Sequence, residues 1–206
     1  MPFRAVIFDL GGVVLGSPLH AIAAYERELG IEAGCVNRVV ADTGDAGAWS
    51  RLERGLLDLE AFYPAFEKDC AASGFTLSAS TMFARMGAEA MPRPAMLRAI
   101  ERLREEGLRT AALTNNWATS DTGPNSLIPI FDEFVESAVE GLQKPDPRIY
   151  ELVLARLGTT PAESIFLDDI GRNLKAARAM GITTIKVDAP EKALAELQAH
   201  VGFDLG

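Results

Sequence analysis

Cysteine, positive charge and long apolar runs are all scarce in this sequence, and each scarcity removes a class of proteins. The 206 residues include two cysteines, Cys35 and Cys70, whose spacing fits no metal motif, so we predict a reduced, cytoplasmic protein. The net charge is −9 and no basic cluster occurs, which argues against a nucleic-acid partner. Arg4 and Asp9 interrupt the apolar N-terminus, and no run of about 18 apolar residues occurs, so we expect neither a signal peptide nor a membrane span.

The sequence is nevertheless rich enough in apolar residues, at 48%, to bury the core of one domain, or of a domain with a small insertion. Short apolar runs without alternation predict buried strands at residues 5–8, 110–113, 134–135, 164–167 and 183–187. Amphipathic spacing and capping signals predict helices at residues 94–106, 147–157 and 173–180, with a further helix after residue 190. Asp146 is the expected N-cap of the second of these, residues 160–163 form a capping box, and Asp188 is the expected cap of the last.

Residues from about 18 to 87 differ from the rest because they contain several helical stretches and few strand signals. The remainder alternates strand and helix, which predicts a parallel sheet covered on both faces. We therefore predict an α/β core formed by residues 1–16 and 88–206, with a helical cap at residues 17–87. Ligands bind beyond the carboxyl ends of strands in such sheets, so the cap is expected to cover that end.

Polar residues follow several of the predicted strands and should meet at that end of the sheet. They are Asp9, the segment 114–116, Asp168 with Asp169, and Lys144 after a short loop. Taken singly, each fits ordinary turn or capping chemistry. Taken together, neighbouring carboxylates repel one another unless a cation joins them. A hard cation with oxygen ligands, Mg²⁺, fits such a set.

Four segments, FDLGGVV, LTNN, QKPDPRIY and FLDDIGRNL, resemble in order and spacing the four motifs of the haloacid dehalogenase (HAD) superfamily. The resemblance covers essentially the whole chain and implies a HAD-like, Rossmannoid parallel sheet with a C1-type helical cap. KPDPRIY and SIFLDDIGRNLK are more narrowly similar to the N-terminal phosphatase domain of soluble epoxide hydrolases and to the HAD-like domain of a multidomain acyl-CoA dehydrogenase.

The resemblance implies a role for each matching residue. Asp9 would be the nucleophile that forms an aspartyl-phosphate, and the cofactor Mg²⁺ would be held by Asp9, the carbonyl of Gly11 and Asp169. Lys144 would reduce the repulsion between Asp9 and the incoming phosphate.

The same resemblance assigns substrate binding and support to four further groups. Thr114, with the backbone or amide of Asn115, would hydrogen-bond the phosphoryl oxygens alongside Lys144. Asp168 and Asn173 would orient Lys144 or the metal-bound waters.

One position departs from the pattern of the family's phosphatases. They carry a second aspartate two residues after the nucleophile, where it protonates the leaving group, and this sequence has Gly11 there. General acid–base catalysis contributes about 10²–10⁴-fold, so we expect weak turnover of alkyl phosphates. The cap residues His20, Glu26, Arg51 and Glu53 are candidates for supplying the missing group.

Three interpretations follow from the sequence. The leading one is a Mg²⁺-dependent phosphatase of a small phosphorylated metabolite. A 2-haloacid dehalogenase also needs no aspartate at position 11, but that branch lacks the pair formed by Asp168 and Asp169. The third is a ligand-binding HAD scaffold without activity, which Gly11 favours and which the intact Asp9, Lys144 and Asp169 oppose.

Overall fold

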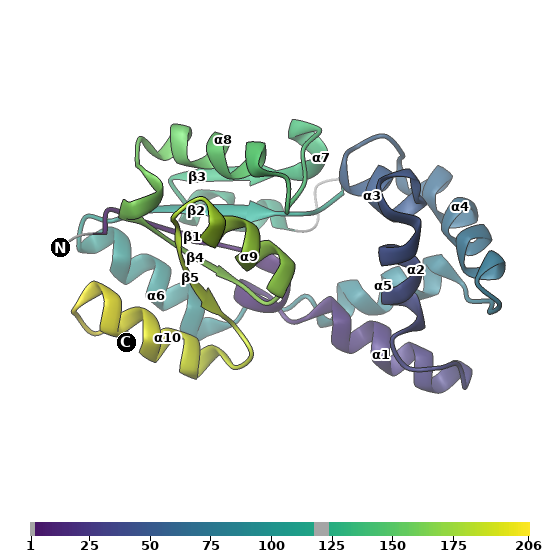
Figure 1. The fold of residues 1–206 in the computed structure, drawn as a ribbon. Helices are drawn as coiled ribbons and strands as arrows, with labels where there is room; N and C mark the ends of the chain where they lie inside the picture. The colour runs from purple at the N-terminus through teal and green to yellow at the C-terminus, as the bar shows by residue number, and fades with distance from the viewer. Residues whose placement is uncertain (1–2, 118–123) are drawn as a thin grey trace.

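The computed structural model describes residues 3–117 and 124–206, in which a parallel sheet is covered by helices on both faces (Figure 1). Five strands lie in the order β3-β2-β1-β4-β5, and every adjacent pair is parallel. This arrangement confirms the predicted fold class. The strands are β1 (Ala5–Phe8), β2 (Arg109–Thr114), β3 (Glu133–Glu136), β4 (Ser164–Asp168) and β5 (Thr183–Lys186).

Two helices cover each face of the sheet. Helices α6 (Pro94–Glu105) and α10 (Pro190–Val201) pack on one face, and α8 (Pro147–Leu157) and α9 (Gly171–Ala179) pack on the other. Strand β1 lies in the middle and is fully buried, with alternate side chains in the two hydrophobic clusters. A strand covered on both faces has no polar side, which explains the unbroken apolar run in the sequence.

Some predicted element boundaries are confirmed and others are wrong. The Asp146 side chain accepts a hydrogen bond from Arg148 N at the start of α8, and the capping box at residues 160–163 is present. Asp188 does not cap α10: Ala189 occupies the N-cap position, and Asp188 forms an ion pair with Lys186 at 2.8 Å. Helix α9 begins two residues earlier than predicted, and a short helix α7 (Ser137–Glu140) follows β3 without a sequence prediction.

Five helices inserted after β1 lie beyond the carboxyl end of the sheet and form their own hydrophobic cluster (Figure 1). They are α1 (Pro18–Leu29), α2 (Cys35–Thr43), α3 (Ala48–Glu53), α4 (Leu59–Ala72) and α5 (Ala79–Glu89). The cluster contains both cysteines, buried and free, and a set of aromatic rings in mutual contact. We call this unit the cap; its division from the core at residues 17 and 87 stays a prediction.

Two antiparallel segments connect the cap to the core. Leu15 and Pro92 form a bridge, and Gly16 N donates to the carbonyl of Met91 at 3.0 Å. A Cβ atom on Gly16 would overlap the carbonyl oxygen of Glu89, so only glycine permits this close approach. No helix within residues 3–117 and 124–206 is both long and apolar enough to cross a membrane.

Candidate active site

The carboxyl ends of the three central strands bring the predicted polar residues together. Phe8 is paired with Ala112 of β2 and with Leu167 of β4, so the next residue, Asp9, emerges between the ends of both neighbours. Carboxylate oxygens of Asp9, Asp168 and Asp169 lie within 4.8 Å of one another. The sheet register therefore produces the acidic cluster that the sequence predicts.

Lys144 is fully buried, and its ammonium contacts two of the three carboxylates. Its Nζ lies 2.9 Å from Asp9 Oδ1 and 2.9 Å from Asp168 Oδ2, and it donates to the carbonyl of Leu113 at 2.8 Å. An ammonium group has three donors, and each is directed at an oxygen here. Burial alone would lower the pKa of Lys144, but the carboxylates of Asp168 and Asp9 raise it above its ordinary value, so the ammonium stays charged.

Asp9 offers one oxygen for chemistry. Oδ1 accepts from Leu10 N at 2.7 Å as well as from Lys144, whereas Oδ2 has no hydrogen-bond partner among the described residues. Burial raises the pKa of Asp9, the nearby Asp168 and Asp169 act in the same direction, and Lys144 opposes them. A cation close to the Asp9 carboxylate would relieve this repulsion and keep it ionised.

Two glycines follow Asp9 and have different roles. Gly12 has a φ of 79°, and a Cβ atom there would overlap the Asp169 carboxylate, so glycine makes room for that side chain. Gly11 has φ −64° and ψ 125°, and a Cβ atom added there would be 3.4 Å from Pro18 Cδ. A Cβ atom at position 11 is therefore tolerated, so neither the φ angle nor a backbone contact requires glycine there.

Asp169 completes the cluster without a cation of its own among the described residues. Burial raises the pKa of Asp169 to about 6, with a further contribution from Asp168. The cluster holds three carboxylates but one ammonium, which is ion-paired with Asp9 and Asp168, and this excess of negative charge suits a divalent cation with oxygen ligands. Asp9 and Asp169 could hold Mg²⁺ here, and the resemblance adds the carbonyl of Gly11 as a further candidate ligand.

The carboxylate of Asp168 forms an ion pair with Lys144. Its side chain is fully buried and accepts from Ile170 N at 2.6 Å, while Asn173 Nδ2 lies 3.3 and 3.1 Å from its two oxygens. These bonds fix the carboxylate against the lysine. The contacts are compatible with the orienting role that the resemblance implies for Asp168 and Asn173, and that role stays a prediction.

Thr114 and Asn115, the expected phosphate-binding residues, lie at the end of β2. Thr114 lines the cavity described below, next to Gly11. The Asn115 amide binds the backbone of Lys144 on both sides, accepting from its N–H at 2.8 Å and donating to its carbonyl at 3.0 Å. The backbone N–H is therefore the group of Asn115 that remains for a phosphoryl oxygen.

The four cap residues considered as substitutes for the missing acid occupy different places. His20 and Arg51 are exposed. Glu26 is buried inside the cap and accepts from the N–H groups of Gly34 and Val36, at 2.7 and 2.9 Å, so it caps α2.

Glu53 is the one of these four candidates that contacts a motif residue of the core. Its Oε2 accepts from Asn115 Nδ2 at 3.3 Å, and its Oε1 accepts from Trp49 Nε1 at 3.0 Å. Burial raises the pKa of Glu53, opposed by the Trp49 hydrogen bond and by the charge of Arg172. Nothing in the spacing of the sequence pairs Glu53 with Asn115, because the two belong to different units of the fold.

A cavity of about 540 Å³ lies between the cap and the core, beside Gly11 and Thr114. Its lining is largely apolar and includes Trp117, which no sequence motif singles out and whose ring lies 4.8 Å from that of Phe83 in the cap. The cap contributes four large apolar side chains to the lining, Leu59, Tyr63, Phe83 and Met86. Leu10 and Gly11, the two residues that follow Asp9, also line this space.

Comparisons with proteins of known sequence agree on one family. Residues 3–181 match the model of the haloacid dehalogenase-like hydrolases. The chain is 42% identical to acyl-CoA dehydrogenase family member 10 of Mus musculus over 98% of its own length and 20% of that protein. It is 35% identical to bifunctional epoxide hydrolase 2 of Sus scrofa, over its whole length and 40% of that protein, so it spans less than half of either relative. It is also 28% identical to the sesquiterpene phosphatase of Aspergillus oryzae, covering 97% of each chain.

Solved structures share the fold. A predicted HAD-like hydrolase from Porphyromonas gingivalis matches with a TM-score of 0.73 at 21% identity, over 99% of this chain and all of the other. A HAD-family enzyme from Bacteroides thetaiotaomicron, in complex with magnesium and inorganic phosphate, matches with a TM-score of 0.62 at 21% identity, over 89% and 93% of the two chains. The family match, the two relatives above 30% identity and the shared fold confirm the resemblance seen in the motifs: this chain belongs to the haloacid dehalogenase-like hydrolases.

Proposed function

We propose that this hydrolase is a Mg²⁺-dependent phosphatase that acts through an aspartyl-phosphate on Asp9. The observation that carries the proposal is the cluster of three carboxylates at the carboxyl ends of β1 and β4, two of which are ion-paired with the buried Lys144. Such a cluster supplies a nucleophile, a site for a hard cation and a fixed positive charge within a few ångströms.

Asp9, the Gly11 carbonyl and Asp169 would hold Mg²⁺, which neutralises charge on the phosphate and on the carboxylates. Asp9 Oδ2 attacks phosphorus as the ester oxygen departs, and water then attacks the same phosphorus to release inorganic phosphate and free Asp9. Lys144 holds Asp9 Oδ1 and offers positive charge to the transferring group. Thr114 and the backbone N–H of Asn115 bind its remaining oxygens.

The departing oxygen receives its proton without help from position 11, since Gly11 has no side chain. Phosphate esters with acidic leaving groups, such as aryl and acyl phosphates, should therefore react fastest. Glu26 caps α2, and neither it nor His20 or Arg51 lines the cavity beside Gly11.

The apolar cavity suggests the rest of the substrate. Leu59, Tyr63 and Phe83 face the space beyond Gly11 and Thr114, which suits a phosphate ester with an apolar group. The relative of matching length is named a sesquiterpene phosphatase, which agrees with a substrate of that kind. In a series of n-alkyl phosphates, kcat/KM should rise by about threefold to fourfold per methylene buried, the kinetic equivalent of about 0.8 kcal/mol.

Hydrolysis assays on the purified chain test the proposal. We expect release of phosphate from p-nitrophenyl phosphate and acetyl phosphate that requires Mg²⁺, and no halide from 2-chloropropionate. Release of halide without metal would replace the phosphatase with a dehalogenase. Inactivity on both, with phosphate still binding in a Mg²⁺-dependent manner, would support a ligand-binding scaffold instead.

A further inference from the structure

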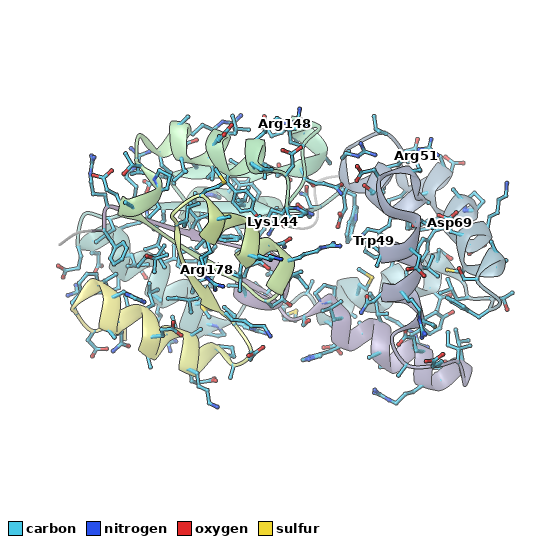
Figure 2. The ribbon with its side chains drawn as sticks, viewed as in Figure 1. Trp49, Arg51, Asp69, Lys144, Arg148 and Arg178 are labelled. Carbon is cyan, nitrogen blue, oxygen red and sulfur yellow. The ribbon has the colours of Figure 1, made fainter. Side chains whose placement is uncertain are left out.

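Cap helix α3 and the turn after it contact two core segments, the loop that leads into Lys144 and helix α7. Ser50 Oγ of α3 receives a hydrogen bond from Gln143 Nε2 at 2.9 Å, and Gln143 is the residue before Lys144. Just after α3, Gly55 lies so close to Ala138 that a Cβ atom would overlap its carbonyl oxygen. Figure 2 shows Trp49 at the side of the cap that faces the core and Lys144 at the end of the sheet that faces the cap.

Glu53 is the last residue of α3, and its carboxylate joins the two units. Oε1 accepts from Trp49 within the cap, and Oε2 accepts from the Asn115 amide in the core. One hydrogen of the Asn115 Nδ2 group goes to Glu53 and the other to the carbonyl of Lys144, while Asn115 Oδ1 takes the N–H of Lys144. The amide therefore has no donor to spare, and its orientation depends on both partners.

Glu53 does not line the cavity beside Gly11, so its effect on the reaction passes through other residues. We propose that Glu53 is a positioning residue: through Asn115 it ties the docked cap to the backbone of Lys144 and so fixes the ammonium that contacts Asp9. This role rests on the proposed phosphatase function for its effect on rate. Its structural part, the coupling of Glu53 to Lys144, is independent of any activity.

The structural part is measured by amide hydrogen exchange of the metal-free protein. The Lys144 N–H donates to Asn115 Oδ1, and the Asn116 N–H donates to Ser137 Oγ, away from Glu53. In Glu53→Ala, we expect exchange at Lys144 to rise by about tenfold or more, as for the loss of one hydrogen bond to a charged group, and exchange at Asn116 to stay unchanged. The matched control is Ser50→Ala, which removes another cap–core hydrogen bond of α3 and should leave Lys144 exchange within about twofold of wild type.

The kinetic part uses the same variants with p-nitrophenyl phosphate and Mg²⁺. Glu53→Ala should lower kcat about tenfold with little change in KM, since the ammonium would be misplaced in the transition state rather than in binding. Glu53→Gln keeps one carbonyl oxygen for Trp49 or Asn115 but not for both, so its kcat and its Lys144 exchange should fall between wild type and Glu53→Ala. It also keeps the proposal falsifiable if Glu53→Ala does not fold.

The decisive comparison is the double variant in which Glu53→Ala is combined with Asn115→Ala. If Glu53 acts through Asn115, Glu53→Ala should change neither kcat nor Lys144 exchange further in that background. Additive effects, or Lys144 exchange in Glu53→Ala equal to that in Ser50→Ala, would overturn the proposal. A wild type without phosphatase activity would defeat the proposed function alone, because the exchange experiment reads the coupling directly.

Discussion

The core and the cap both bury charged side chains, but they use them differently. In the core, Asp9, Lys144 and Asp168 contact one another at the carboxyl ends of the strands. In the cap, the buried Glu26 binds backbone N–H groups of α2, and the surrounding interior is aromatic and aliphatic. A charge that satisfies its own backbone stabilises a fold, whereas charges that satisfy each other only in part leave room for a cation and a substrate.

Replacement of the core lysine should have the largest effect. Lys144→Met leaves Asp9 and Asp168 buried without their counter-charge, which costs about 3–5 kcal/mol in the free energy of unfolding, and removes the positive charge from the reaction. We expect a large fall in the urea midpoint and no detectable phosphatase activity. Lys175→Met, at an exposed position of α9, serves as the control and should change neither.

An acid restored at position 11 of the core should increase the turnover of one class of substrate, the alkyl phosphates. The φ of −64° at Gly11 and the space beside Pro18 accommodate a side chain, so Gly11→Asp should fold. Turnover of alkyl phosphates should rise by about 10²-fold, near the lower limit for acid–base catalysis, and aryl phosphates should gain far less. Wild-type rates that are already equal for alkyl and aryl phosphates would mean that a group elsewhere supplies the proton.

The charge of Asp169 should lower the stability of the metal-free protein and should be needed for metal binding. A carboxyl group whose pKa is higher in the folded state binds a proton more readily there, so its contribution to stability falls as pH rises from 3.8 to about 6. Asp169→Asn removes this repulsion, and we expect a higher Tm than wild type at pH 7 without metal.

Millimolar Mg²⁺ should reverse that order. It should raise the Tm of the wild type at pH 7, less so at pH 5, and should have little effect on Asp169→Asn. Thermal unfolding at the two pH values, with and without Mg²⁺, measures each effect. An equal response to Mg²⁺ in wild type and variant would assign the metal to other ligands; Asp168→Asn should retain more of the response than Asp169→Asn.

The smallest effect is expected in the cap. Glu26→Ala leaves the N–H groups of Gly34 and Val36 without their acceptor, so the free energy of unfolding should fall by about 1–2 kcal/mol, as for the loss of a helix cap. Well below the Tm of the variant, kcat for p-nitrophenyl phosphate should equal that of the wild type. A change in kcat would show that the cap carboxylate reaches the chemistry and would break the contrast between the two units.

The same contrast governs what the sequence could predict. Asp9, Thr114 and Asp168 were placed together because parallel strands end at one edge, so a strand assignment fixes the position of the next residue. Cap residues have no comparable rule: Glu53 meets Asn115 only because α3 docks in one orientation, which depends on the packing of the whole helical cluster. The incorrect N-cap prediction at Asp188 has a local cause, since an ion pair with Lys186 is available to that side chain.

The assignment of function depends most directly on Asp9 as the group that bonds phosphorus. Beryllofluoride, which occupies the place of a phosphoryl group on a carboxylate, should raise the Tm of the wild type in the presence of Mg²⁺, because a ligand that binds only the folded state stabilises it by about 2.7 kcal/mol at one hundred times its Kd. We predict no such rise in Asp9→Asn, together with the loss of phosphatase activity. An equal rise in Asp9→Asn, or turnover near the wild-type rate, would contradict the assignment of Asp9 as the nucleophile.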